Sequence, residues 1–175
     1  MRRGLFWASL ATDAPSLQGA FMEQLDKIDR GMLDMLQRDG RVSNARLAEA
    51  FSLSETSCWR RLRRLEEAGL IEGYHARLDR RKLGLGVMAF VQIVCTQHSE
   101  EVTAEFERLI AASPNVLACD NTTGEADFLL QVVAADLDDY SHFVEKVLRK
   151  LPGVLSIRSN LSLRQLKSTH RLPIV

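Results

Sequence analysis

The hydrophobic pattern of this chain changes once, near residue 86, and this change constrains the fold more than any other feature of the sequence. Before it, apolar residues recur at helical spacing in three short segments. After it, β-branched apolar runs alternate with amphipathic stretches. The 175 residues are enough for two small domains. We therefore expect an α+β chain with a helical domain over residues 22–79, a linker over 80–86 and a mixed domain over 87–175.

Three helices are predicted before residue 70. In "LDKIDRGMLDML" the apolar side chains lie at helical spacing, and Gly40 follows as the expected helix breaker. Ser43 can cap a second helix, and Ser54 can cap a third that runs to about Ala68 and ends at Gly69. Two helices, a tight turn and a third helix in so short a stretch form a helix-turn-helix arrangement.

The segment after the third helix, "LIEGYHARLD", has apolar and aromatic residues typical of a strand, and Gly73 permits a bend. This pattern is compatible with a small β-wing, which makes the helical domain a winged helix-turn-helix. The next stretch, "RRKLGLG", contains two glycines and three consecutive basic residues, and we interpret it as the linker.

Four strands and two helices are predicted in the mixed domain. Residues 87–95 form a buried strand, Ser99 can cap a helix that reaches about Ala112, and "PNVLACDNTT" and "ADFLLQVVA" supply two strands. Asp136 can cap the second helix, with Asp139 placed to bond back, and "PGVLSIRSNLSL" supplies the last strand. The order β-α-β-β-α-β is the ferredoxin-like arrangement.

The third helix, "SETSCWRRLRRLEEAG", has two different faces. Cys58, Leu62 and Leu65 form a stripe toward the core, and Arg61 lies close enough to that stripe to be a structural ion-pair partner. The opposite face is basic and carries an aromatic residue, which an idle surface would not favour, although most charged runs are simply solvated. In a helix-turn-helix the last helix enters the major groove of DNA. Short hydroxyl side chains at helix N-termini suit phosphate oxygens. The predicted DNA-binding residues are Ser43, Ser54, Thr56, Ser57, Trp59, Arg60, Arg63 and Arg64.

Composition excludes several other classes. The formal net charge is zero, so the local arginine cluster matters more than the total. Three widely spaced cysteines without a C-x-x-C motif argue against disulfides and a zinc site, fit a reducing cytoplasm, and suggest three buried thiols. No apolar run approaches the ~20 residues of a membrane span. Residues 1–21 are expected to be a flexible extension or the result of an upstream start codon, with Met22 a natural start for the first helix.

With these blocks in place, the chain resembles the Lrp/AsnC family of leucine-responsive, or feast/famine, transcription regulators over about residues 24–175. The resemblance rests on "LDKIDRGMLDMLQRDGRVSNARLAEAFSLSETSCWRRLRRLEEAGLIEGYHARLD", "TGEADFLLQV" and "LPGVLSIRSNLSLRQLK", in this order and spacing. It implies double-stranded DNA as partner, a ligand-sensing ferredoxin-like domain, an amino acid as effector, and homodimers that assemble further, commonly to octamers.

The resemblance also implies an effector site near a G-D-x-D loop, which here is Gly124-Glu125-Ala126-Asp127. Glu125 keeps the charge of the commoner Asp, whereas Ala126 replaces a residue that is often larger. Asp127 is suited to an ammonium group and the backbone N–H groups near Gly124 to a carboxylate. Further candidates are Thr122, Thr123, Arg158 and Ser159. From the residues alone, a glycine turn with a solvated acid remains the alternative.

Two other functions remain open at this stage. An architectural DNA-binding protein without ligand response has the same sequence features. Some proteins of this architecture resemble siroheme decarboxylases, but enzymatic function needs acids or bases gathered at one pocket. The four histidines are scattered through the predicted elements, and we expect no catalytic residue, metal or cofactor; they are His75, His98, His142 and His170.

Overall fold

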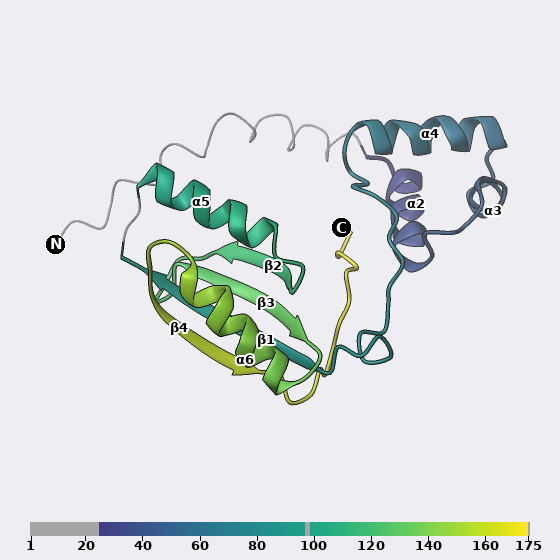
Figure 1. Cartoon of the computed structure of the whole chain (residues 1–175). Coiled ribbons are helices and arrows are strands. Elements are labelled where there is room, and N and C mark those ends of the chain that lie inside the picture. The colour runs from purple at the N-terminus through teal and green to yellow at the C-terminus, as the bar shows by residue number, and fades with distance from the viewer. Residues whose placement is uncertain (1–24, 97–98, 175) are drawn as a thin grey trace. The chain divides into compact units, whose positions relative to one another are not determined.

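The computed structural model describes residues 25–96 and 99–174 and divides into two compact units. The first unit contains residues 25–76 together with 169–174, and the second contains residues 77–168 (Figure 1). The extension predicted over residues 1–21, the helix start at Met22 and His98 lie outside the described residues. Residues 169–174 pack with the first unit, although their sequence position places them in the mixed domain.

Three helices build the first unit, and local caps set where they begin. They are α2 (Lys27–Arg38), α3 (Asn44–Ala50) and α4 (Glu55–Glu67). The Ser43 hydroxyl accepts a hydrogen bond from the backbone of Arg46, and the Ser54 hydroxyl accepts one from Ser57, as predicted for N-caps. Helix α4 ends as predicted, with Gly69 in the left-handed region at φ 71°.

The end of α2 differs from the prediction. Asp39 is the C-cap, and its N–H donates to the carbonyl of Met35. Gly40 follows in a turn and does not adopt a positive φ, so α2 does not need a glycine there.

The core of the first unit lies between the three helices. Its fully or nearly fully buried side chains are Met32, Leu47, Ala48 and Cys58. Leu65 is also buried on the inner side of α4, and Leu62 packs partly against the cluster, so the predicted inner stripe of α4 is confirmed.

The predicted wing strand is absent from the described residues. Residues 71–79 form neither helix nor strand, because a wing needs a second strand to pair with and none lies in the described part of this unit. The stretch predicted to be the linker contains a hydrogen-bonded turn. The Arg80 guanidinium donates to the carbonyl oxygens of Leu85 and Gly86, at 2.6 and 2.9 Å.

The second unit has the predicted β-α-β-β-α-β order. Its strands are β1 (Val87–Cys95), β2 (Val116–Asn121), β3 (Phe128–Ala134) and β4 (Val154–Leu161), arranged β2-β3-β1-β4 with every pair antiparallel. Its helices are α5 (Glu100–Ala111) and α6 (Leu137–Lys146), followed by a short 3-10 turn, η1 (Leu148–Lys150). The predicted caps Ser99 and Asp136 are both present. The Asp139 carboxylate accepts from the backbone of Ala135 rather than from the cap residue itself.

The two faces of the sheet differ. Helices α5 and α6 pack on one face, where Phe106, Tyr140 and Phe143 meet the inward residues of β1 and β3 (Figure 1). Successive strand residues point to opposite faces, so the other face carries Phe90, Gln92, Val94, Leu129, Gln131, Arg158 and Asn160. Phe90 is 41% exposed there, which leaves an apolar surface that the helices do not cover.

The prediction that all three cysteines are buried is wrong for one of them. Cys58 is buried and Cys95 half-buried, but Cys119 is exposed because it lies on the edge strand β2. All three are free thiols. No helix within residues 25–96 or 99–174 has the length and apolar character to cross a membrane.

Truncating the centre of the sheet should destabilise the second unit. Leu130 in β3 is fully buried, so Leu130→Ala should lower the free energy of unfolding by about 2–5 kcal/mol through lost burial and a cavity. Leu155, which is 64% exposed, provides the control, and Leu155→Ala should change it by less than ~0.5 kcal/mol. Urea denaturation measures both, and equal effects would contradict the assigned core.

Candidate nucleic-acid interface and ligand site

The outward face of α4 is basic and exposed. Thr56, Arg60 and Arg63 are exposed, and Trp59 is 51% exposed. The Arg63 guanidinium lies 5.2 Å from the centroid of the Trp59 ring, and its Nε is 2.7 Å from Glu67 Oε1. Arg60 forms no ion pair with any described residue. Of the four arginines of α4, Arg60 therefore presents the least compensated charge.

The inward side of the same helix is held by acidic residues of α2. Arg61 Nη1 lies 2.7 Å from Asp26 Oδ2 and 2.9 Å from Asp29 Oδ1, in agreement with the structural ion pair predicted for it. The hydrogen bonds that Arg61 donates to Asp26 and Asp29 raise its pKa, so it stays charged. Arg64 Nη2 binds the other oxygen of Asp29. Arg64, predicted to face DNA, is thus shared between this contact and solvent, since half of its side chain is exposed.

Asp29 is a structural residue behind this face that the sequence reasoning missed. It is the one charged residue classed as buried in the described chain, with 0% exposure. It also belongs to a capping box, in which Asp29 N–H donates to Asp26 Oδ1 at 2.8 Å and Asp26 N–H to Asp29 Oδ2 at 3.3 Å. A buried carboxylate is tolerated only when its charge and lone pairs are compensated. The spacing Asp26-x-x-Asp29 was the available signal, because it fits a capping box.

The hydroxyl residues predicted to meet phosphate lie at the helix starts. Ser43 and Ser54 each use an oxygen lone pair to cap a helix, which leaves the hydroxyl hydrogen available for a further acceptor. The Asn44 side chain, which was not predicted, donates to the carbonyl of Glu55 at 2.9 Å and joins the starts of α3 and α4. Ser57 and Thr56 lie in the first turn of α4, where the helix dipole favours anions.

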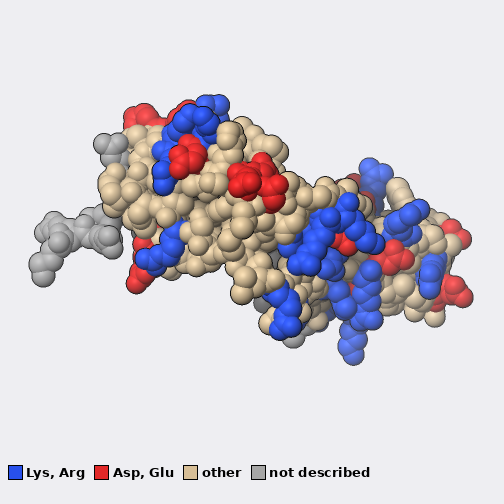
Figure 2. Space-filling model, turned by 60° about the horizontal axis from the view of Figure 1, so that its bottom comes forward, with Lys and Arg blue, Asp and Glu red and all other residues tan. Residues whose placement is uncertain are grey.

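A shallow groove follows α4. It is lined by Asp26, Asp29, Ser57, Trp59, Arg60, Arg61, Arg63, Arg64 and Glu67. Figure 2 shows Lys and Arg side chains denser over the first unit than over the visible face of the second unit. Positive charge of this kind attracts a polyanion.

The predicted ligand loop is a turn fastened by its own hydrogen bonds. Gly124 has φ 145°, a conformation that favours glycine. The Thr122 hydroxyl donates to the carbonyl of Ala126 at 2.8 Å, and the Thr122 N–H donates to the carbonyl of Asp127 at 2.9 Å. Among the described residues, no acceptor binds the N–H groups of Thr123, Gly124 and Glu125.

The Asp127 carboxylate is half-buried and partly engaged. Its Oδ2 accepts from the Cys95 N–H at 2.7 Å, while no described residue donates to Oδ1. Burial first, and then the charge of Asp127, raise the pKa of the Cys95 thiol, so Cys95 stays protonated near neutral pH. Asp127 therefore anchors the end of β1 and still offers one oxygen.

The candidates on β4 do not form one site. Arg158 points to the open face and approaches Glu125 at 4.0 Å, with both side chains largely exposed. Ser159 points to the helix-covered face, where its Oγ accepts from the Tyr140 hydroxyl at 2.5 Å. Neighbouring strand residues face opposite ways, so the structure does not bring Ser159 together with Arg158. Arg158 stays with the loop and Ser159 belongs to the packing of α6.

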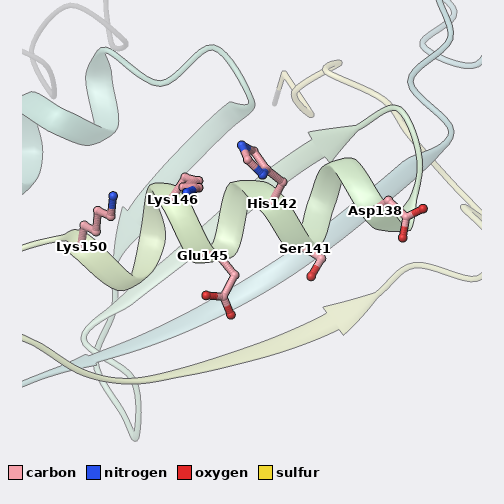
Figure 3. A pocket seen from close by; sticks show the side chains of 6 residues that line it. All are labelled: Asp138, Ser141, His142, Glu145, Lys146 and Lys150. Carbon is pink, nitrogen blue, oxygen red and sulfur yellow. The ribbon is translucent and has the colours of Figure 1, made fainter.

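Another hollow lies along the outer surface of α6 (Figure 3). Its lining comes from α6 and η1 alone, and none of the predicted site residues is among Asp138, Ser141, His142, Glu145, Lys146 and Lys150. Within residues 25–96 and 99–174, no group of three or more His, Cys, Asp or Glu side chains is arranged to hold a metal ion.

Each of the two units matches a known protein family. Residues 25–72 match the family described as "Winged helix-turn-helix DNA-binding", and residues 88–172 match "Lrp/AsnC ligand binding domain". The chain is 41% identical over 150 residues to the DNA-binding transcriptional activator DecR of Escherichia coli, covering 86% of this chain and 99% of DecR. It is 34% identical over 152 residues to the leucine-responsive regulatory protein of Escherichia coli, and the match covers 87% of this chain and 93% of that protein.

A solved structure resembles the whole described chain. It is the transcriptional regulator NMB0573 of Neisseria meningitidis in complex with L-Met, with a TM-score of 0.82 and 37% sequence identity. The similarity covers 86% of this chain and 97% of that one.

Removing the charge of Asp29 should weaken the first unit. Asp29→Asn leaves Arg61 and Arg64 without their shared carboxylate, and the free energy of unfolding should fall by about 2–3 kcal/mol. This is below the cost for a fully buried pair because water reaches both arginines. Urea denaturation provides the measurement. The control Glu67→Gln removes an exposed ion pair and should cost less than ~0.5 kcal/mol. A stable Asp29→Asn protein would sink this assignment.

Proposed function

This chain belongs to the Lrp/AsnC family of transcription regulators, and we propose that it binds specific sites on double-stranded DNA through the exposed face of α4. Like the relatives that it matches, it is a transcription regulator and not an enzyme. The observation that carries the DNA proposal is the difference between the two sides of α4. On one side Asp29 pairs with arginines of the helix, and on the other Arg60 is exposed and has no ion pair with a described residue.

Each residue of that face has a proposed part. Arg60 contacts a base edge or a phosphate, and Arg63 does so from its position over Trp59. Arg64 contacts phosphate with the exposed half of its side chain. The hydroxyl groups at the two helix starts donate to phosphate oxygens; they are Ser43, Ser54, Thr56 and Ser57.

The effector of the second unit is, in our proposal, an amino acid. Support comes from the matched ligand-binding domain and from the related regulator whose structure holds L-Met. Asp127 Oδ1 accepts from the ammonium group, and the N–H groups of residues 123–125 donate to the carboxylate. Glu125, Ala126, Thr122 and Arg158 border the site.

Assembly into homodimers, and then octamers, completes the proposal. The uncovered sheet face supports it, because Phe90, Val94 and Leu129 leave an apolar surface without helices. Effector binding shifts the population between assemblies or DNA-bound geometries by its differential affinity for them. Free thiols fit a cytoplasmic protein.

The second candidate is an architectural DNA-binding protein that responds to no ligand. A thermal-shift screen across the amino acids separates the two, because a ligand that binds the native state raises its apparent stability. Gel-shift titrations with the same panel then test DNA binding. If no amino acid changes stability, assembly or DNA affinity, the architectural function stands instead.

Arg60→Ala should weaken DNA binding and flatten its salt dependence. If Arg60 meets a phosphate, the slope of log affinity against log salt concentration should fall by about 1. Fluorescence anisotropy with a labelled duplex at several salt concentrations measures this slope. Arg149→Ala is the control, because Arg149 is an exposed arginine of the second unit. An unchanged slope and affinity in a folded Arg60→Ala protein would refute the role.

Asp127→Asn should separate ligand sensing from folding. Asparagine keeps an oxygen for the Cys95 N–H but loses the charge that attracts an ammonium group. Loss of a charge-assisted contact should weaken the effector about tenfold or more while basal DNA affinity stays near that of the wild type. Isothermal titration and gel shift measure the two, with Asp120→Asn on β2 as control. Loss of DNA binding in Asp127→Asn would indicate a structural role.

A further inference from the structure

The C-terminal segment, residues 169–174, lies on helix α2 of the first unit. The Leu172 N–H donates to Gln37 Oε1 at 2.5 Å, and Gln37 Nε2 donates to the Leu172 carbonyl at 3.1 Å. The Gln37 amide thus satisfies both backbone groups of one residue, as a neighbouring strand would. Such a contact recognises extended backbone rather than a particular side chain.

An ion pair beside it adds charge selectivity. Arg171 Nη2 lies 3.1 Å from Asp34 Oδ1, and Arg38 Nη2 lies 2.6 Å from Asp34 Oδ2. The Arg171 N–H donates to the Thr169 hydroxyl, which shapes the segment before it reaches the helix. Although desolvation acts to raise the pKa of Asp34, hydrogen bonds from Arg171 and Arg38 outweigh it and hold that pKa below its usual value.

The contact uses the side of α2 that faces away from the core. Met32 and Leu36 point into the helix cluster, whereas Asp34, Gln37 and Arg38 lie about half a turn away on the opposite side. None of these three residues touches the groove along α4. Docking of the segment therefore leaves both the core and the proposed DNA face unchanged.

We propose that Asp34, Gln37 and Arg38 form a docking surface for the chain's own C-terminal segment, and that this segment is a second covalent connection between the two units. The chain leaves the first unit after residue 76 and returns to it at residue 169. Only residues 162–168 separate the returning segment from β4, which carries Arg158 beside the ligand loop. A ligand that displaces β4 pulls on α2 through these residues. This last part rests on the proposed function.

The strength of the contact suits reversible docking. Two hydrogen bonds and one exposed ion pair, offset by the ordering of the segment, favour the docked state by roughly tenfold. A preference of this size is large enough to populate the docked state and small enough for a ligand to reverse.

Amide hydrogen exchange in the full chain tests the docking. The Leu172 amide should exchange about fivefold more slowly in the wild type than in Gln37→Ala or Arg171→Glu, because the first removes the acceptor and the second repels Asp34. Arg164→Glu is the matched control in residues 162–168, just before the segment, and should keep the wild-type rate, since no described residue forms an ion pair with Arg164. Equal Leu172 rates in all four proteins would overturn the docking surface.

Gel-shift titration tests the connection to the ligand site. The ligand used is the amino acid, out of the twenty, that changes the DNA affinity of the wild type. Arg171→Glu should keep basal DNA affinity within about twofold and lose most of the ligand-induced change. A full ligand response in Arg171→Glu, with Leu172 protection lost, would overturn the connection. If no amino acid affects the wild type, the sensing function and the connection both fall, whereas docking is still decided by the exchange rates.

Discussion

The first unit depends on one buried carboxylate. Asp29 is buried, and its charge is tolerated because Arg61 and Arg64 reach it from α4 while the Asp26 N–H at the start of α2 donates to its carboxylate. The carboxylate therefore fixes the angle between α2 and α4 with a directional interaction, which the small apolar cluster of Met32, Leu47 and Cys58 cannot do by itself. The orientation of the side of α4 that we propose to face DNA follows from this contact.

The same contact divides the arginines of α4 by function. Two of them face the acidic residues of α2, a third is held by Glu67 above Trp59, and Arg60 alone has no described ion pair. An arginine cluster that looks uniform in sequence is thus graded from fully compensated to uncompensated charge. Because uncompensated charge releases the most counterions from DNA, this gradation supports the proposal that binding is concentrated on one edge of the helix.

Local signals predicted most of the fold. The caps Ser43, Ser54, Ser99 and Asp136 and the periodicity of each helix depend on nearby residues, and all were confirmed. Predictions that depended on distant residues did worse. No strand forms where the wing was expected in the described residues, although the unit matches a winged helix-turn-helix family, and Cys119 lies on a sheet edge. The Ser159 side chain contacts Tyr140 and is not brought together with Arg158. Asp29 and Gln37 were missed because their partners lie 35 and 135 residues away.

The return of residues 169–174 to α2 has a consequence for the order of folding. Domains generally fold as units during synthesis, beginning at the N-terminus. The helical core of the first unit is complete once residue 76 has left the ribosome, yet its contacts with Arg171 and Leu172 form only after the second unit has been synthesised. The DNA-binding unit therefore acquires its core before the second unit and completes its contacts after it, so a nascent chain that stops before residue 171 lacks these contacts at α2.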